Sequence, residues 1–267
     1  MNARSPIGVF DSGLGGLTVF KVLSRRMPEE SLIYFGDTAH VPYGSKSPEA
    51  IARYSSEVAR FLEKKGIKLL VVACNTSSAW ALPAIRKAVK IPVIGVIEPG
   101  ARGALSVTRG GRVGIIGTEA TVKSGAYEKA LKLLKKSTRT ASAACALFVP
   151  LVEEGWWNGE IVESVARRYL APLKKARVDT VILGCTHYPY LKPVLAKVLG
   201  PRVRLIDSAE ETARETQAVL TRLGLRAPRG RRGSRAFYAS DAPRRFARLG
   251  RRMGAGVNTV KLHRIDS

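Results

Sequence analysis

The chain has 267 residues, and its 45% hydrophobic content is enough for one large domain or two small ones with packed cores. No apolar run approaches the roughly 18 residues of a membrane span, and no apolar signal region precedes the first predicted strand, so we expect a soluble, cytoplasmic protein. The net charge is +24, and three cysteines without disulfide spacing indicate reduced thiols.

Short apolar runs typical of buried parallel strands alternate with amphipathic helical patterns along the chain. In the first part, we expect strands at residues 7–10, 32–35, 69–73 and 92–97, and helices at 17–27, 48–65 and 77–89. Pro99, Gly100 and Gly103 then predict a change of structural unit. In the second part, we expect strands at residues 113–116, 144–148, 181–183 and 203–206, and helices at 123–135, 161–175 and 191–199.

The two parts resemble each other in sequence. Gly8 and Gly114, in the first strand of each part, are 106 residues apart, and Cys74 and Cys185 are 111 apart. We therefore predict an α/β fold of two similar domains, with mainly parallel sheets related by a pseudo-twofold axis and the active site in the cleft between them. The first domain is expected to comprise residues 1–97 and 208–267, and the second residues 98–207.

Each of these cysteines follows a strand pattern and precedes small polar residues and a helical pattern. The carboxyl ends of parallel strands are where open α/β sheets build their sites, so the two thiols are expected to face each other. Inversion of a carbon centre needs a base on one face and an acid on the other, and a thiolate and a thiol supply both. Cys145 lies among alanines with no polar loop after it, and we expect it in the core.

Other enzyme classes fit the same residues less well. The glycines from Gly13 to Gly16 imitate a dinucleotide-binding loop, but Thr18 occupies the last glycine position of that motif. A zinc site using both cysteines and His187 lacks a closely spaced pair of ligands, so no metal is expected. A cysteine hydrolase would leave the second thiol without a role.

The C-terminal part of the chain is strongly basic. Between residues 222 and 252 it contains eleven arginines and one acid, Asp241. Such a segment attracts phosphates, but Phe237, Tyr238 and Phe246 are too scattered to form a stacking array for nucleic acid. We favour a solvated face or attraction of acidic metabolites, and a basic binding protein remains the alternative. The arginines are Arg222, Arg226, Arg229, Arg231, Arg232, Arg235, Arg244, Arg245, Arg248, Arg251 and Arg252.

Four short motifs, taken together, resemble the glutamate racemase family over essentially the whole chain. The residues after the second cysteine, His187 with Tyr188 and Pro189, favour the glutamate branch over the wider aspartate/glutamate racemase group. The motifs are Asp11-Ser12-Gly13, Pro42-Tyr43-Gly44, Ala73-Cys74-Asn75-Thr76 and Gly184-Cys185-Thr186-His187-Tyr188-Pro189.

The resemblance implies that L- and D-glutamate are interconverted without a cofactor or metal. Cys74 would take the α-proton of D-glutamate and Cys185 that of L-glutamate, with Asp11 and His187 assisting. Glu153 matches a family acid near the second cysteine, although Glu154 leaves the register open. The expected substrate-binding residues are Asp11, Ser12, Pro42, Tyr43, Gly44, Asn75, Thr76, Thr118, Thr121, Thr186 and His187.

The resemblance also implies a biological setting. The family supplies D-glutamate for bacterial peptidoglycan, and its members are often dimers, so we expect a homodimer. Some members are regulated by a cell-wall precursor through an N-terminal extension. Because the first predicted strand begins at Ile7, we expect no such regulation here.

Overall fold

The computed structural model describes residues 2–228, 230 and 232–265. The strands are β1 (Ile7–Asp11), β2 (Leu32–Gly36), β3 (Leu69–Val72), β4 (Val93–Gly95), β5 (Arg112–Gly117), β6 (Arg139–Ala144), β7 (Thr180–Gly184), β8 (Arg204–Ile206), β9 (Arg235–Ala239) and β10 (Lys261–Leu262). The helices are α1 (Leu17–Arg26), α2 (Pro48–Lys64), α3 (Asn75–Trp80), α4 (Leu82–Ala88), α5 (Ile97–Val107), α6 (Glu119–Lys123), α7 (Ala126–Leu134), α8 (Phe148–Glu153), α9 (Glu160–Lys175), α10 (Lys192–Leu199), α11 (Ala209–Arg222) and α12 (Pro243–Arg252), with short 3-10 turns η1 (Tyr43–Ser45) and η2 (Tyr188–Leu191).

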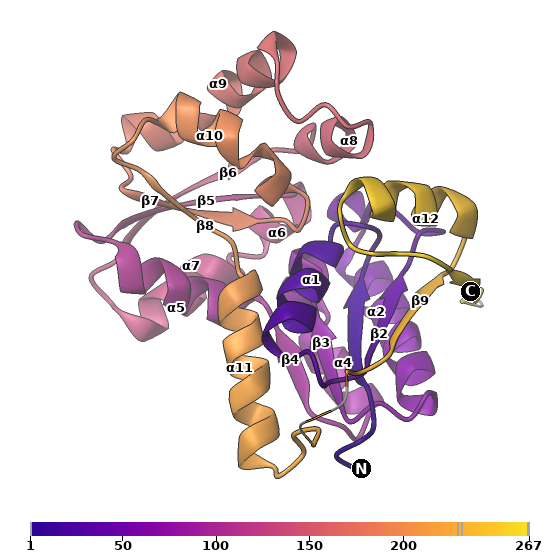
Figure 1. Cartoon of the computed structure of the whole chain (residues 1–267). Coiled ribbons are helices and arrows are strands. Elements are labelled where there is room, and N and C mark those ends of the chain that lie inside the picture. The colour runs from indigo at the N-terminus through magenta and orange to yellow at the C-terminus, as the bar shows by residue number, and fades with distance from the viewer. Residues whose placement is uncertain (1, 229, 231, 266–267) are drawn as a thin grey trace.

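The strands form two separate parallel sheets, which confirms the predicted two-domain α/β fold (Figure 1). One sheet has the order β10-β9-β2-β1-β3-β4 and the other β6-β5-β7-β8. The order β2-β1-β3-β4 in the first sheet is therefore repeated as β6-β5-β7-β8 in the second. The chain leaves the first sheet after β4 and returns to it with β9. The exact domain bounds, at residues 97 and 208, stay a prediction.

Alternation along each strand places apolar side chains on both faces of the sheets. In β1, Ile7 and Val9 pack in the same core cluster as α1, whereas Phe10 packs in the cluster that contains residues of α2. In β7, Ile182 joins the cluster formed with α5 and α7, and Val181 joins that of α9 and α10. Both sheets are thus covered by helices on both faces, which leaves the carboxyl ends of the strands as the place for a site.

Three expectations about the elements were wrong. The strand expected at residues 144–148 lies at Arg139–Ala144, because β6 is a partly exposed edge strand of small and polar residues without an apolar run. The helix expected at residues 77–89 is two helices, α3 and α4, with Pro83 in the first turn of α4. The helix expected at residues 123–135 is likewise divided, at Gly125, whose φ of 62° favours glycine.

The predicted change of unit after residue 97 is occupied by a helix, α5, which contains Pro99, Gly100 and Gly103.

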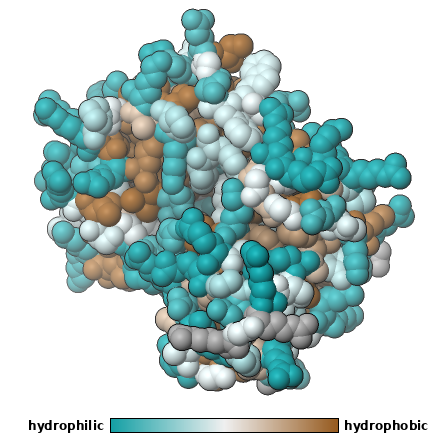
Figure 2. All heavy atoms as spheres, viewed as in Figure 1, coloured by the Kyte–Doolittle hydropathy of each residue, from teal (hydrophilic) through white to brown (hydrophobic). Residues whose placement is uncertain are grey.

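Hydrophilic side chains cover most of the face in Figure 2. Among the described residues, no helix is both long enough and apolar enough to span a membrane.

Candidate active site

Two cysteines occupy equivalent places at the carboxyl ends of the sheets. Cys74 lies between β3 and α3, and Cys185 directly follows β7, the equivalent strand of the second sheet. Both line one cavity of about 390 Å³, although each is less than a tenth exposed. The cavity walls are Ser12, Val41, Pro42, Tyr43, Gly44, Ser45, Cys74, Asn75, Thr76, Thr118, Glu119, Ala146, Val149, Pro150, Glu153, Cys185, Thr186 and His187.

The first half-site is built around the Cys74 thiol. The sulfur accepts the backbone N–H of Ser77 at 3.5 Å in the first turn of α3, and it donates to Ser12 Oγ at 3.6 Å. Burial, reinforced by the negative charge of Asp11, raises the pKa of Cys74 to about 11, although the hydrogen bonds with Ser77 and Ser12 oppose this rise. At neutral pH, Cys74 is therefore a thiol, the form that donates a proton.

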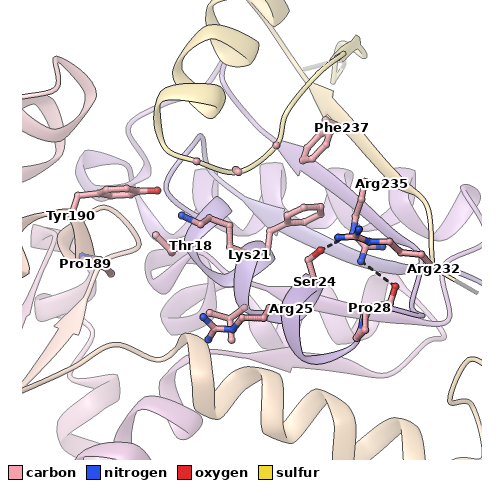
Figure 3. Close-up of a pocket in the computed structure, with 15 residues that line it drawn as sticks. Thr18, Lys21, Ser24, Arg25, Pro28, Pro189, Tyr190, Arg232, Arg235 and Phe237 are labelled. Atoms are coloured by element: carbon pink, nitrogen blue, oxygen red, sulfur yellow. Dashed lines mark hydrogen bonds between the residues drawn. The ribbon is translucent and has the colours of Figure 1, made fainter. Parts of the chain in front are cut away.

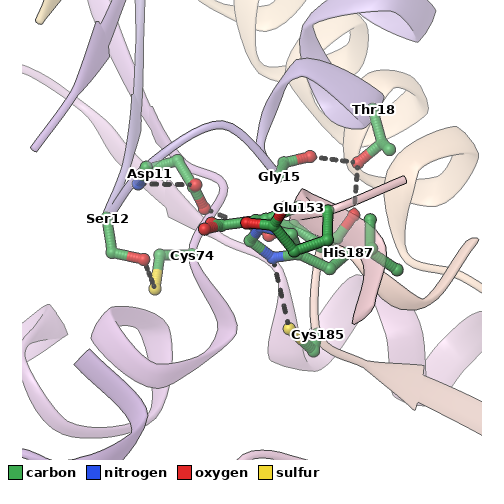
Figure 4. Close-up of polar contacts among 12 residues, drawn as sticks. Asp11, Ser12, Gly15, Thr18, Cys74, Glu153, Cys185 and His187 are labelled. Atoms are coloured by element: carbon green, nitrogen blue, oxygen red, sulfur yellow. Dashed lines mark hydrogen bonds and ion pairs between the residues drawn. The ribbon is translucent and has the colours of Figure 1, made fainter. Parts of the chain in front are cut away.

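The second half-site is a chain of three groups. Cys185 Sγ lies 3.8 Å from His187 Nδ1, and His187 Nε2 lies 3.2 Å from Glu153 Oε1 (Figure 4). Burial lowers the pKa of His187, but its contacts with Cys185 and Glu153 outweigh burial and raise that pKa to about 10. His187 is thus an imidazolium at neutral pH, held between the Cys185 sulfur and the Glu153 carboxyl group. Glu154 is exposed, so the geometry selects Glu153 as the partner of His187.

Asp11 lies behind the cavity and does not line it. It is fully buried, accepts the backbone N–H of Gly13 at 2.9 Å, and accepts the hydroxyl of Thr186 at 3.3 Å. Burial raises its pKa, against the opposing effects of the His187 charge and these hydrogen bonds. The carboxyl group therefore links the end of β1 to the segment after β7, across the two sheets.

Threonine hydroxyls form a cluster on the cavity wall. Thr76 Oγ1 lies 3.0 Å from both Thr118 Oγ1 and Thr121 Oγ1, and the latter two are 2.9 Å apart. Thr121 is buried behind the other two and does not reach the cavity. Since each hydroxyl both donates and accepts, the cluster can present an O–H to an anionic ligand from Thr76 or Thr118.

Twelve of the predicted site residues line the cavity, and Asp11 and Thr121 lie behind it. The remaining wall residues were missed. Ser45 and Glu119 directly follow predicted site residues, so adjacency was the available signal. Val149 and Pro150 belong to α8, whose first residue, Phe148, falls in the strand expected at residues 144–148.

The glycine loop after β1 has a role other than phosphate binding. A Cβ at Gly15 would lie 2.3 Å from Thr186 Oγ1 and 2.6 Å from His187 Nδ1. The absence of a side chain therefore lets the loop of the first sheet approach the second half-site.

Substitution of Gly15 by alanine is expected to lower kcat of the reaction in this cavity by about ten- to a hundredfold. The reason is that Thr186 and His187 must move from their positions. Gly13→Ala is the matched control, since a Cβ there meets only Val41 Cγ1, at 3.1 Å. Its effect should be much smaller in the same initial-rate assay. Equal losses in both variants would contradict this role of Gly15.

The raised pKa of Cys74 predicts slow alkylation at neutral pH. In a variant with Cys145 and Cys185 replaced by alanine, Cys74 is the only cysteine of the chain. Its rate with iodoacetamide should still rise about tenfold per pH unit between pH 8 and pH 10, because only the thiolate reacts. The urea-unfolded chain is the control and should level off near pH 9. A plateau at that pH in the folded protein would contradict the raised pKa.

A larger cavity, of about 860 Å³, lies against α1 and next to residues 222–252, the Arg-rich segment (Figure 3). Lys21, Arg25, Arg232 and Arg235 line it, and its described lining residues include no cysteine, histidine or carboxylate. Arg235 donates to Ser24 Oγ and to the carbonyls of Pro28 and Glu30, so this arginine ties β9 to the loop after α1. The two cysteines, His187 and Glu153 line the smaller cavity and not this one. Arg229 and Arg231 lie outside the described residues.

Within the part of the chain that the structure describes, no three His, Cys, Asp or Glu side chains are grouped as metal ligands would be. The groups that converge on the cavity are instead two thiols, an imidazolium–carboxylate pair, hydroxyls and the amide of Asn75. This set can remove and return a proton and can hold an anion by neutral donors.

The family model described as Asp/Glu/Hydantoin racemase matches residues 15–216. A glutamate racemase from Geobacter metallireducens is 54% identical over 250 residues, which cover 94% of this chain and 93% of that protein. The crystal structure of a glutamate racemase isoform from Bacillus anthracis superimposes with a TM-score of 0.94 at 40% identity, covering 98% of both chains. A glutamate racemase from Francisella tularensis, solved in complex with D-glutamate, gives a TM-score of 0.92 at 37% identity and 99% coverage of both chains.

Proposed function

Because the chain belongs to the Asp/Glu/hydantoin racemase family, and within it to the glutamate racemases, we propose that it interconverts L- and D-glutamate by moving the α-proton between Cys74 and Cys185. One observation carries the proposal: the two thiols come from equivalent strands of different sheets and line the same cavity. A substrate bound between them has one sulfur on each side of its α-carbon, which is the arrangement that inversion requires.

The raised pKa of Cys74 suits the conversion of L- to D-glutamate. In this direction Cys185 acts as the base in its thiolate form beside His187 and takes the α-proton, and the electron pair of the C–H bond remains on the α-carbon. Cys74, held as a thiol, then gives its proton to the opposite face. The product leaves with Cys185 as a thiol and Cys74 as a thiolate, the state from which D-glutamate is converted back. No oxidation state changes, so the proposed step requires no redox cofactor.

The carboxylates of the substrate are expected to be held by neutral donors. Among the described lining residues there is no lysine or arginine, despite the net charge of +24. We propose that Ser12, Pro42, Tyr43, Gly44, Asn75, Thr76, Thr118 and Thr186 contact the substrate through hydroxyls, the amide and backbone groups, with Thr121 supporting the threonine cluster. Asp11 and the His187–Glu153 pair assist Cys74 and Cys185 respectively.

We propose in addition that the product serves bacterial peptidoglycan synthesis and that the protein acts in the cytoplasm as a homodimer, as the family resemblance implies. These points rest on that resemblance. We also propose a domain division near residues 97 and 208. The wall of the cavity is then assembled from both domains, and closure of the domains would exclude water from the carbanion-like intermediate.

The proposal is tested by circular dichroism of the purified protein with L-glutamate, and separately with L-aspartate, without added cofactor. The expected result is loss of the L-glutamate signal to zero as the racemate forms, and an unchanged L-aspartate signal. If both substrates keep their optical activity, the racemase proposal fails. A salt-dependent shift of DNA by the inactive protein would then favour a basic binding protein.

A further inference from the structure

One buried tyrosine touches a neighbour of each cysteine. Tyr127 of α7 is 1% exposed, and its hydroxyl donates to Asn75 Oδ1 at 2.6 Å. Its ring packs against Gly184, where a Cβ would lie 3.1 Å from the ring atom Cε2. Asn75 directly follows Cys74 and Gly184 directly precedes Cys185, so this side chain bridges the two half-sites.

The position of the ring is fixed by close packing on a second residue. A Cβ at Gly100 of α5 would lie 3.1 Å from both Cε1 and the hydroxyl oxygen of Tyr127. The phenol is therefore held between two glycines, one from α5 and one from the end of β7. Burial raises the pKa of Tyr127, and the charges of Cys185 and Asp207 raise it further, so the group remains a neutral hydroxyl donor.

The direction of this hydrogen bond decides what Asn75 offers to the cavity. An asparagine amide has an oxygen that accepts and a nitrogen that donates two hydrogen bonds. Because the oxygen is engaged by Tyr127, the nitrogen of Asn75 is the part left for the cavity, whose wall Asn75 forms. A carboxylate accepts from N–H groups, and an amide turned the other way would present it with an oxygen.

We propose that Tyr127 is a positioning residue, which fixes the Asn75 amide so that its N–H groups face a substrate carboxylate and which keeps the two half-sites in register. The inference rests on the proposed function, since it concerns the binding of a dicarboxylate in the same cavity. The fixed amide matters here because the described lining residues include no lysine or arginine that would hold the carboxylate by charge.

The first test is Tyr127→Phe, which keeps the ring between Gly100 and Gly184 and removes only the donor. KM for L- and D-glutamate should rise about tenfold, while kcat stays within about twofold, because the amide loses its orientation but the thiols keep theirs. Tyr169→Phe is the control, since its hydroxyl accepts the N–H of Leu147 and contacts no cavity residue through that bond. An unchanged KM in Tyr127→Phe, with wild-type racemisation intact, would overturn the proposal.

A double-mutant cycle separates positioning from a general loss of stability. Asn75→Ala should raise KM by at least as much as Tyr127→Phe, and adding Tyr127→Phe to it should produce no further rise. A further rise of similar size in the double variant would mean that Tyr127 acts by another route. Inactivity of the wild-type protein would count against the proposed function instead, so the two failures remain distinct.

Asn75→Asp tests the orientation of the amide and does not depend on the folding of the tyrosine variant. Aspartate still accepts from the Tyr127 hydroxyl, but it turns a charged oxygen toward the cavity. If N–H groups face the substrate in the wild type, KM should rise by about a hundredfold or more, because two carboxylates then oppose each other. A KM equal to that of the wild type would show that an oxygen already faces the substrate, and would overturn the proposal.

Discussion

Replacement of either Cys74 or Cys185 by alanine is expected to lower glutamate racemisation by between about a hundredfold and ten-thousandfold. In the proposed mechanism each thiol carries one of the two proton transfers, and general acid–base groups contribute factors of this size. Neither thiol can replace the other as proton carrier, because the two belong to different sheets and face the cavity from opposite half-sites. Initial rates from both enantiomers, measured by circular dichroism, check this.

Cys145 provides the matched control. It is also a buried free cysteine that follows a strand, but it does not line the cavity. Cys145→Ala should therefore lower the melting temperature slightly and leave kcat/KM close to the wild-type value. If this variant lost activity as strongly as the other two, loss of folded structure rather than loss of a proton carrier would explain all three.

Hydrogen exchange in D₂O then assigns a face to each thiol. With Cys185 as the remaining base, the Cys74→Ala variant should exchange the α-proton of L-glutamate and leave D-glutamate unlabelled. The Cys185→Ala variant should show the opposite preference. Proton NMR of the α-position follows both reactions. Exchange of both enantiomers by one variant would contradict the assignment of one base to each face.

The second large effect is expected from a buried ion pair far from the cavity. Lys68 and Glu30 are both almost completely buried, and Lys68 Nζ lies 2.5 Å from Glu30 Oε2. Lys68 also donates to the carbonyls of Ala3 and Leu225, at 2.6 and 2.8 Å, and Glu30 accepts the N–H of Ala227 at 2.8 Å. The pair thus joins the N-terminal segment, the start of β3 and the chain that leads to β9.

Lys68→Met should lower the free energy of unfolding by about 3–5 kcal/mol, because it leaves the Glu30 carboxylate buried without its partner. Urea denaturation at pH 7 measures this. Lys197→Met is the control, because Lys197 pairs with Glu163 at the surface, and it should lower the free energy of unfolding much less. Equal destabilisation by the two substitutions would contradict the importance of burial. Replacing both Lys68 and Glu30 by apolar residues should recover only part of the loss, because three backbone groups would remain without their partners.

The sequence predicted the parts of the fold that depend on local pattern. The strands that carry Cys74 and Cys185 are continuous apolar runs in the middle of their sheets, so their position and burial followed from periodicity. The edge strand β6 has no such run, and the apolar residues that follow it belong to α8, so its position was wrong.

Local sequence patterns did not predict the contacts between segments that are distant in the chain. Nothing in the spacing of Glu30 and Lys68 indicates that they meet, and a lysine before an apolar strand is ordinarily expected at the surface. Tyr127 gave no signal either, because it lies in an ordinary amphipathic helix, and its importance comes from two glycines in other elements. Within the Arg-rich segment, pattern alone did not separate Arg235, which binds backbone carbonyls, from its exposed neighbours.

The two thiols of the cavity lie in different surroundings, and this has a kinetic consequence. In the proposed mechanism, each passage from L- to D-glutamate leaves the protein as the tautomer opposite to the one in which it began, with the proton now on Cys185. The raised pKa of Cys74 disfavours the thiolate that this tautomer contains. Under a steady supply of L-glutamate, the free protein must therefore exchange a proton with water or buffer before each new turnover. The two enantiomers still reach equal concentrations. The asymmetry of the site affects only the rate at which the free protein returns to the tautomer that binds the next L-glutamate.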